Sequence, residues 1–381
     1  MSLLNKVCKA VSGFLLILSC LTAVTAILGS FHFWLFLRLP AKPFSENKQF
    51  LVPKTSAYGV ARLLESQGVI RDARAFFLLG WLKNSLHRMQ AGEYAFSTLY
   101  TPEQVLDQIV NGRVVIHTVI LPEGSTLWDV ARILHQKELA PESEIIEVAS
   151  SAKFAGSLGV KANGLEGYLF PDTYQFTKPV SSASIAEKMV RRFWQRLPKE
   201  WPNRVKELRL SLHEIIIVAS IIEKEAVVDS ERPRIAAVFY NRLKVNMPLQ
   251  SDPTAVYDIP GFSGPVTAAH LTRQSPYNTY RIKGLPPGPI CSPGTESIKA
   301  ALNPEKGVPY LYFVSNNDGT HHFSVTAEEH QNAVSHYYEL KKKTPGDKSP
   351  TIGDSLETSP QDSRAGAEPH RQADGVNPNS P

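Results

Sequence analysis

The sequence is poor in cysteine and has no recognisable metal-ligand spacing. Only three cysteines occur in 381 residues, and two of them, Cys8 and Cys20, lie in or beside an apolar N-terminal run. The third, Cys291, has no internal partner for a disulfide and no histidine or asparagine arrangement that would mark it as a nucleophile. We therefore predict that Cys291 is a small packing residue. Neither HExxH nor paired CxxC motifs occur, so we expect no metal and no other cofactor.

A strong excess of charge of either sign is also lacking. The chain contains 41 Lys and Arg against 36 Asp and Glu, which gives a net charge of +5. No run of basic residues stands beside aromatic residues, as a nucleic-acid-binding face requires, so we expect no nucleic acid partner. With 43% hydrophobic and 20% charged residues, the chain can bury a core and fold into two or three domains.

Charged residues are absent between Ala10 and Leu37. A helix over this range would rise roughly 42 Å at about 1.5 Å per residue, which exceeds the roughly 30 Å hydrocarbon core of a bilayer. We therefore predict a transmembrane helix at residues 10–37, preceded by a cytoplasmic segment at residues 1–9. The flanking basic residues are balanced, but the short N-terminal arm favours an inside amino terminus and places the bulk of the chain outside.

Two alternatives to a membrane anchor are open for this segment. The stretch LTAVTA could end a cleaved signal peptide, and Cys20 in ILSC could carry a lipid. The apolar run continues well past both features, so the anchor is favoured.

The other end of the chain, residues 343–381, has the composition of a disordered tail. It is rich in Pro, Gly, Ser, Asp and Gln and contains few aliphatic residues. Such a segment cannot bury enough apolar area to offset the entropy lost on ordering.

An internal repeat lies between the anchor and the tail. YGVARLLESQGVI at residues 58–70 resembles LWDVARILHQKEL at residues 127–139. Each copy follows a short strand-like piece in which Ser or Thr is placed to cap the next helix. A third helix, PEQVLDQIVNG, should end at Gly112. These patterns predict a small α+β module at residues 50–118, which would either bind a polymer or hold the next domain away from the membrane.

The stretch GLEGYLFPDTYQF at residues 164–176 alternates aromatic and other residues around Pro171 and Asp172. This pattern predicts strand, turn and strand. The aromatic rings would either line a sugar groove or pack in a core, and the pattern favours packing.

An almost unbroken apolar segment from His213 to Ala226 ends with two acids, Glu223 and Glu225. A helix that is apolar on nearly every face is buried all round. Loss of hydration disfavours the charged form of a carboxylate, so we expect the pKa of the working acid to rise from about 4.3 towards 6. A glutamic acid that stays protonated near neutral pH is what general acid catalysis requires.

The two acids are two residues apart, or about 200° around a helix, and cannot share one face. At most one of them can act on a substrate bond, and the other would pair with a cation. The candidate cations are Lys224, Arg232 and Arg234. The alternative is that both acids form only salt bridges where the helix emerges.

Two polar loops follow this helix, one in MPLQSDPTAVY and one in SPYNTYRIKGLPPGPICSPG. Their side chains offer donors, acceptors and flat faces suited to sugar hydroxyls, and the prolines limit the entropy lost on binding. The residues concerned are Gln250, Asp252, Thr254, Tyr277, Asn278, Thr279 and Tyr280.

Several motifs resemble, in their order and approximate spacing, those of the endolytic murein transglycosylase family. They are EGYLFPDTY, ASIIEKEA, VFYNRL, MPLQSDPT, SPYNTY, GLPPGPI followed by SPG, YLYFV and HHFS. The resemblance covers about residues 50–340, and an N-terminal membrane anchor is also typical of the family.

The resemblance implies an α+β protein with an N-terminal transmembrane helix, a LysM-like module at residues 50–118 and a mixed α/β catalytic region at residues 119–342. It implies a single-pass inner-membrane enzyme whose periplasmic domain cuts nascent peptidoglycan strands internally. The expected bond lies between N-acetylmuramic acid and N-acetylglucosamine, and the expected products carry 1,6-anhydromuramyl ends. Peptidoglycan synthases are the expected protein partners.

The family's catalytic glutamate, the second acid of its EKE motif, falls on Glu225. The groove residues that the resemblance and the polar loops imply are Glu223, Asp172, Gln250, Asp252, Thr254, Tyr277, Asn278, Thr279, Tyr280 and His321.

Two positions depart from the family pattern. Asp258 stands where a glycine is common, and Ser292 replaces the more usual Asn or Thr before Pro-Gly. Two other functions remain open: a muramidase that uses water, with Asp252 or Glu223 as the base, and a non-catalytic scaffold that binds peptidoglycan.

Overall fold

The structure is a computed structural model that describes residues 2–343. All but the first residue of the predicted tail at residues 343–381 lies outside the described residues. The described chain contains three two-stranded antiparallel sheets, and most of its other elements are helices. This confirms the predicted α+β class.

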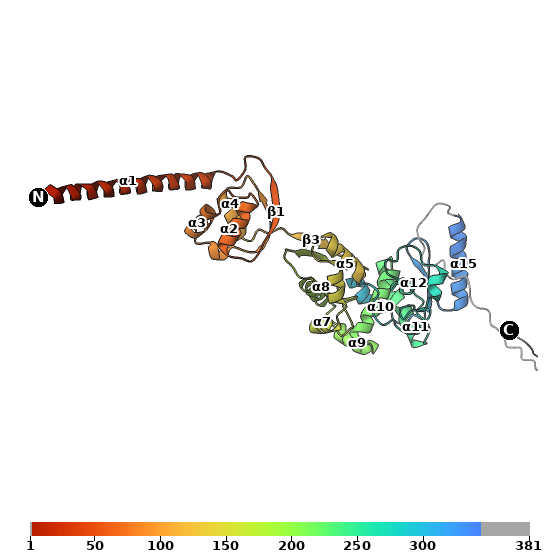
Figure 1. Cartoon of the computed structure of the whole chain (residues 1–381). Coiled ribbons are helices and arrows are strands. Elements are labelled where there is room, and N and C mark those ends of the chain that lie inside the picture. Colours follow the sequence, from red (N-terminus) through yellow and green to blue (C-terminus); the bar gives the residue numbers. More distant parts are fainter. Residues whose placement is uncertain (1, 344–381) are drawn as a thin grey trace, which may run out of the picture. The chain divides into compact units, whose positions relative to one another are not determined.

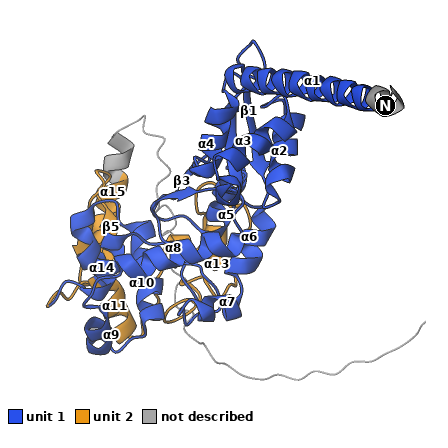
Figure 2. Cartoon of the chain, turned by 90° about the vertical axis from the view of Figure 1, so that its left-hand side faces the viewer, with its two compact units in different colours: residues 1–236, 288–306 blue, residues 237–287, 307–381 orange. Residues whose placement is uncertain are grey.

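The chain divides into two compact units, shown in different colours in Figure 2. Unit 1 comprises residues 1–236 and 288–306, and unit 2 comprises residues 237–287 and 307–381. The acids Glu223 and Glu225 therefore belong to unit 1, as does the end of the second polar loop from residue 288, whereas the first polar loop and the start of the second belong to unit 2.

A long helix, α1 (Ser2–Arg38), opens unit 1 (Figure 1). The stretch Val7–Arg38 has a mean hydropathy of 2.3, and among residues 2–343 it is the one helix long and apolar enough to cross a membrane. The predicted apolar helix at residues 10–37 is therefore present. It is compatible with single-pass anchoring and with a signal sequence.

A two-stranded sheet and three helices form the next part of unit 1. Strand β1 (Asn47–Val52) pairs antiparallel with β2 (Gly92–Ser97). The helices are α2 (Ala57–Ser66), α3 (Ala73–Leu82) and α4 (Pro102–Val110). A short 3-10 helix, η1 (Leu86–Arg88), precedes β2. The buried core includes Leu64, Phe76, Tyr94, Phe96 and Ile109. This is the α+β arrangement predicted for residues 50–118.

The predicted helix caps of the repeat are present. The Ser56 hydroxyl accepts a hydrogen bond from the N–H of Gly59 at the start of α2. The Thr126 hydroxyl accepts one from the N–H of Asp129 at the start of α5 (Leu127–Gln136). Gly112, two residues beyond α4, has a φ of +61°, a conformation that favours glycine.

A second sheet joins β3 (His117–Ile120) to β4 (Thr173–Phe176) in antiparallel pairing. The helices of this region, besides α5, are α6 (Glu142–Ala149), α7 (Ala152–Ser157), α8 (Ser182–Arg196) and α9 (Trp201–Leu208). The sheet and the helices enclose a core that contains the aromatic residues of the 164–176 segment.

The prediction of strand, turn and strand at residues 164–176 is wrong in its first half. Only β4 is a strand, and residues 164–172 form turns in which Gly167 has a φ of +82°. Tyr168, Phe170 and Tyr174 are buried. Their rings pack in the core, as the pattern favoured, because this compact segment buries side chains on more than one face without needing a second strand.

The apolar helix is α10 (Leu212–Glu225), and its eight residues from Ile215 to Ile222 are all buried. It begins with a capping box formed by Ser211 and Glu214. Helix α14 (Thr295–Leu302) packs along it. The prediction of a helix buried all round, ending at two acids, is confirmed.

Helix α11 (Arg232–Lys244) follows the 3-10 turn η2 (Asp229–Glu231) and continues from unit 1 into unit 2. Unit 2 also holds two short helices and an antiparallel hairpin against which the last helix packs. These elements are α12 (Asp252–Val256), α13 (Ala268–Thr272), β5 (Tyr312–Ser315), β6 (His321–Ser324) and α15 (Ala327–Lys343).

Truncation of a buried side chain of α10 is expected to destabilise the protein. Ile221 is 0% exposed, whereas Ile120 on β3 is 66% exposed. Ile221→Ala should lower the free energy of unfolding by about 2–5 kcal/mol, because it leaves a cavity in a packed core. The matched change Ile120→Ala should cost less than about 1 kcal/mol. Denaturant unfolding of the full chain in detergent measures both, and equal effects would contradict the assigned burial.

Candidate active site

Glu223 and Glu225 lie in the last turn of α10 and enter different surroundings. Consecutive helix residues are about 100° apart, so these two side chains leave the axis about 200° from one another. Both residues are half-buried as a whole, and the Glu223 side chain is 7% exposed. The Glu223 carboxyl group therefore belongs to the interior of unit 1.

Glu223 is held by two donors. Its Oε1 lies 3.4 Å from Nη1 of Arg232, and its Oε2 accepts a hydrogen bond from the N–H of Gly294 at 2.9 Å. Arg232 is itself buried and also contacts Asp229 and the hydroxyl of Ser297. Pairing of one acid with a cation is thus confirmed, with Arg232 as the partner of Glu223.

The loop before α14 is fixed to α10 by hydrogen bonds. The Ser220 hydroxyl accepts from the N–H of Ile290 at 3.0 Å, and Sγ of Cys291 contacts the Ser220 carbonyl at 3.3 Å. Cys291 is fully buried, and burial raises the pKa of its thiol well above the usual range. It is the packing residue that the sequence predicts.

Asp172 is tied to α8. Its Oδ2 accepts from Nε of Arg192 at 2.5 Å and lies 3.6 Å from Arg196, while its Oδ1 accepts from the N–H of Thr173. Partial burial would raise the pKa of Asp172, but the hydrogen bonds from Arg192 and the Thr173 N–H, together with the charges of Arg192 and Arg196, outweigh it and the pKa is lowered. None of these partners belongs to the end of α10.

Three of the predicted groove residues lie inside unit 2. Asn278, Thr279 and Thr254 are 0% exposed. Asn278 donates to the backbone carbonyls of Leu271 and Arg273, and the hydroxyls of Thr254 and Thr279 lie 2.8 Å apart. Their geometry supports shaping of the two polar loops rather than direct contact with a ligand.

Asp252 and Tyr280 form one pair. The Tyr280 hydroxyl donates to Oδ1 of Asp252 at 2.5 Å. Asp252 is buried, and burial raises the pKa of its carboxyl although the Tyr280 hydrogen bond acts in the opposite direction. The pair connects the start of α12 to the second polar loop.

Gln250, Tyr277 and His321 retain exposed surface in unit 2. Gln250 is exposed and has a φ of +49°. The ring of Tyr277 lies 4.7 Å from that of Tyr257, and the ring of His321 meets Phe313 edge to face at 5.4 Å. Gln250 is thus exposed, whereas Tyr277 and His321 are half-buried, as are Asp172 and Tyr280.

The two departures from the family pattern have local consequences. The Asp258 carboxylate accepts hydrogen bonds from Arg273 and from the Ser275 hydroxyl, and so fixes the loop that leads to Tyr277. Ser292 is buried, and its hydroxyl has no hydrogen-bond partner. Its backbone N–H donates to the Ser125 carbonyl at 2.8 Å.

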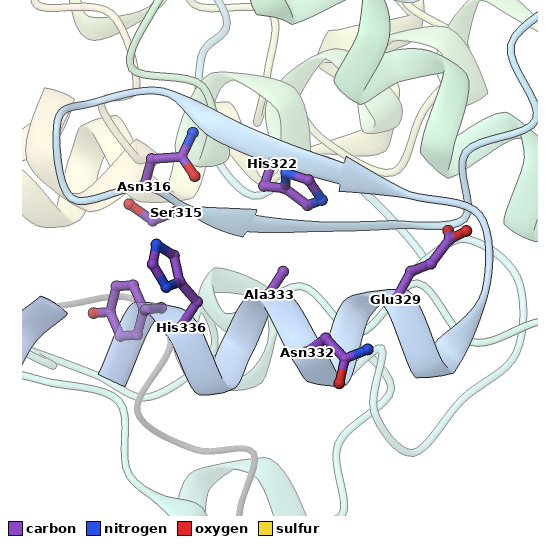
Figure 3. A pocket seen from close by; sticks show the side chains of 8 residues that line it. Ser315, Asn316, His322, Glu329, Asn332, Ala333 and His336 are labelled. Atoms are coloured by element: carbon purple, nitrogen blue, oxygen red, sulfur yellow. The ribbon is translucent and has the colours of Figure 1, made fainter. Parts of the chain in front are cut away.

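A cavity of about 360 Å³ lies in unit 2 between the β5–β6 hairpin and α15 (Figure 3). It is lined by Ser315, Asn316, His322, Glu329, Asn332, Ala333, His336 and Tyr337. No residue predicted for the site lines it, and Glu329 is occupied in accepting hydrogen bonds from the start of α15. Among residues 2–343, no group of three His, Cys, Asp or Glu is arranged to hold a metal ion.

Sequence reasoning missed Glu123, which lies in the turn between β3 and α5. Burial and the charge of Glu223 raise the pKa of the Glu123 carboxyl group. The stretch LPEGST was interpreted only as a helix cap. An acid inside a Pro-Gly turn was the available signal, but nothing local connects it to α10.

A family model and individual proteins with similar sequences match this chain over most of its length. A model described as the YceG-like family matches residues 50–336. The chain is 31% identical over 304 residues to the endolytic murein transglycosylase of Bacillus subtilis (strain 168), covering 76% of this chain and 84% of that protein. It is 29% identical over 314 residues to the endolytic murein transglycosylase of Streptococcus pneumoniae serotype 2 (strain D39), covering 74% of this chain and 56% of that protein.

A solved structure also matches. The crystal structure of a putative YceG-like protein from Listeria monocytogenes aligns with a TM-score of 0.52 and 32% identity. The match covers 76% of this chain and 100% of that chain.

Loss of the buried cation is expected to destabilise unit 1. Arg232→Ala leaves the Glu223 carboxylate without its charge partner and should cost about 3–5 kcal/mol. The control is Arg191→Ala, which breaks an exposed pair with Glu187 on α8 and should cost less than about 1 kcal/mol. Denaturant midpoints measure both. A cost for Arg232→Ala no larger than that of the control would rule out a structural role for the buried pair.

Proposed function

The chain belongs to the YceG-like family and is a lytic transglycosylase, and we propose that it cuts peptidoglycan strands internally with Glu225 as its acid and base. The observation that carries the assignment is the end of α10. There a buried apolar helix finishes with two half-buried acids, Glu223 and Glu225. The Glu223 carboxyl group pairs with Arg232 and accepts from the Gly294 N–H, and Glu225 is the acid on which the catalytic position of the family's EKE motif falls. A partly desolvated glutamic acid suits general acid catalysis.

The proposed reaction needs one carboxyl group in two roles. Protonated Glu225 donates to the glycosidic oxygen between N-acetylmuramic acid and N-acetylglucosamine, and positive charge develops at the muramyl C1. The Glu225 carboxylate then accepts the proton of the muramyl C6 hydroxyl as that oxygen attacks C1. A 1,6-anhydro ring forms and no water is consumed. The nucleophile is already held within the substrate, whose acetamide group can assist.

The surroundings of the other carboxyl groups support this reaction over hydrolysis. A hydrolase normally needs a second carboxyl group to activate water or to act as the nucleophile. Glu223 already accepts from the Gly294 N–H and pairs with Arg232, and Asp252 is buried and accepts from Tyr280. The carboxyl groups of Glu223 and Asp252 are therefore both engaged by neighbouring groups of the protein.

We propose two classes of groove residue. Gln250, which is exposed, and the half-buried rings of Tyr277 and His321 would contact the glycan. The others, apart from Glu223, would shape the groove through the contacts described above. They are Asp172, Asp252, Thr254, Asn278, Thr279 and Tyr280.

The proposed setting is the periplasmic side of the inner membrane, where new strands are synthesised. Helix α1 would anchor the chain, with residues 1–9 inside. The α+β part at residues 50–118 would be a LysM-like module that holds glycan, and the enzyme would end strand elongation beside peptidoglycan synthases. A position at the membrane would favour internal cuts in nascent strands.

Glu225→Gln is expected to lower the rate of glycan cleavage by about 10²–10⁴-fold, because an amide can neither donate nor accept the required proton. Purified glycan strands are digested and the products are weighed by mass spectrometry. The parent protein should give anhydro ends, which are lighter than reducing ends by one water molecule.

The control for this variant is Glu214→Gln on the first turn of the same helix. Glutamine can also serve in a capping box, so the helix start is preserved. Cleavage by Glu225→Gln at the parent rate would remove Glu225 from the mechanism. Products with reducing ends alone would instead identify a hydrolase.

Deletion of residues 2–38 is expected to release the protein from membranes that retain the full chain after an alkaline carbonate wash. The reason is that α1 supplies the apolar length needed to cross a bilayer. A variant in which an unrelated transmembrane helix replaces these residues should remain in the membrane fraction. Retention of the deleted form would show that another part of the chain binds the membrane.

A further inference from the structure

The turn at residues 121–125, between β3 and α5, is hydrogen-bonded to two other segments of unit 1. The N–H of Gly124 donates to the Ser292 carbonyl at 2.9 Å, and the N–H of Ser292 donates to the Ser125 carbonyl at 2.8 Å. Nζ of Lys224, in the last turn of α10, donates to the Gly124 carbonyl at 3.1 Å. The turn therefore connects the end of α10 to the loop that precedes α14.

The carboxyl group of Glu123 lies directly on Gly294. A methyl group on residue 294 would overlap both carboxyl oxygens of Glu123. The backbone at this position does not itself require glycine, because φ is −75° and ψ is 174°. The space that a side chain at position 294 would fill is occupied by the Glu123 carboxyl group.

Glu223 also contacts Gly294. The N–H of Gly294 donates to Glu223, so the carboxyl groups of Glu123 and Glu223 meet at one residue at the start of α14. Burial and the charge of Glu223 raise the pKa of Glu123, Arg232 opposes this shift, and Asp229 and Glu296 add to it. Glu123 therefore keeps its proton to a higher pH than a free glutamic acid does.

We propose that Glu123 is a positioning residue for Glu225. Its carboxyl group keeps the loop at residues 291–294 against the last turn of α10, and so holds Glu225 in place without touching the substrate. The inference rests on the proposed function and concerns only contacts within unit 1. It adds a residue from the β3–α5 turn to a site that the EKE motif alone would not include.

The test is a double-mutant cycle on glycan cleavage with the full chain. Glu123→Ala removes the carboxyl group, and Gly294→Ala displaces it while leaving Glu123 in the sequence. Each should lower kcat by about tenfold or more, with KM unchanged, because small displacements of a catalytic group are costly. The double variant should be no slower than the slower single variant, since both changes remove the same contact.

Two further variants separate positioning from general damage. Glu123→Gln keeps the shape and hydrogen-bonding capacity of a protonated carboxyl group and should restore most of the rate lost in Glu123→Ala. Glu296→Ala removes an exposed acid from the first turn of α14 that pairs with Lys299 and should behave like the parent. An unchanged kcat in Glu123→Ala, a change in KM alone, or multiplied losses in the double variant would overturn the proposal.

A second readout does not depend on catalysis. In a Cys8→Ser, Cys20→Ser background, Cys291 is the one remaining thiol of the chain, and it is a buried residue of the loop at residues 291–294. A thiol reagent should label native Glu123→Ala and Gly294→Ala faster than the parent, Glu123→Gln or Glu296→Ala. Equal labelling rates throughout would refute the positioning role. Absence of anhydro ends from the parent would refute the proposed function alone, because the labelling result would still stand.

Discussion

The contact between Glu223 and Arg232 is the interaction on which the arrangement of the acids depends. Both side chains are almost completely removed from water, so the attraction between their charges is strong. Loss of either partner would leave the other as an uncompensated buried charge. Gly294 supplies a second donor to Glu223, and Ser297 a contact to Arg232. One buried pair thereby joins the end of α10, the start of α11 and the start of α14.

This pair explains why a core helix can end in two acids. The helical repeat sends Glu223 and Glu225 to different sides of α10. The inward acid finds a cation and a backbone donor, and its charge is satisfied inside unit 1. Glu225 is half-buried at the end of the same apolar helix. Engagement of Glu223 inside unit 1 supports the proposed chemistry, which needs only one carboxyl group.

Local patterns predicted several of the elements of unit 1. The Ser56 and Thr126 caps, the helix ending before Gly112 and the buried α10 all follow from residues within a few positions of one another. The first of the two strands expected at residues 164–176 is absent because alternating aromatic residues also occur in compact buried turns. Burial of Asn278 in unit 2 was not foreseen either, since a polar loop residue can serve the loop itself as readily as a ligand.

The sequence by itself determined where the capped helices α2, α5 and α10 begin and which two acids end α10, because capping and helical periodicity depend on near neighbours. Family resemblance then favoured Glu225 over Glu223 as the proposed catalytic acid, which spacing alone could not do. Only the tertiary structure decided that Arg232, rather than Lys224, pairs with Glu223 and that Glu123 rests on Gly294. These contacts join segments far apart in the chain, and their partners are selected by packing, desolvation and direction, which no local pattern records.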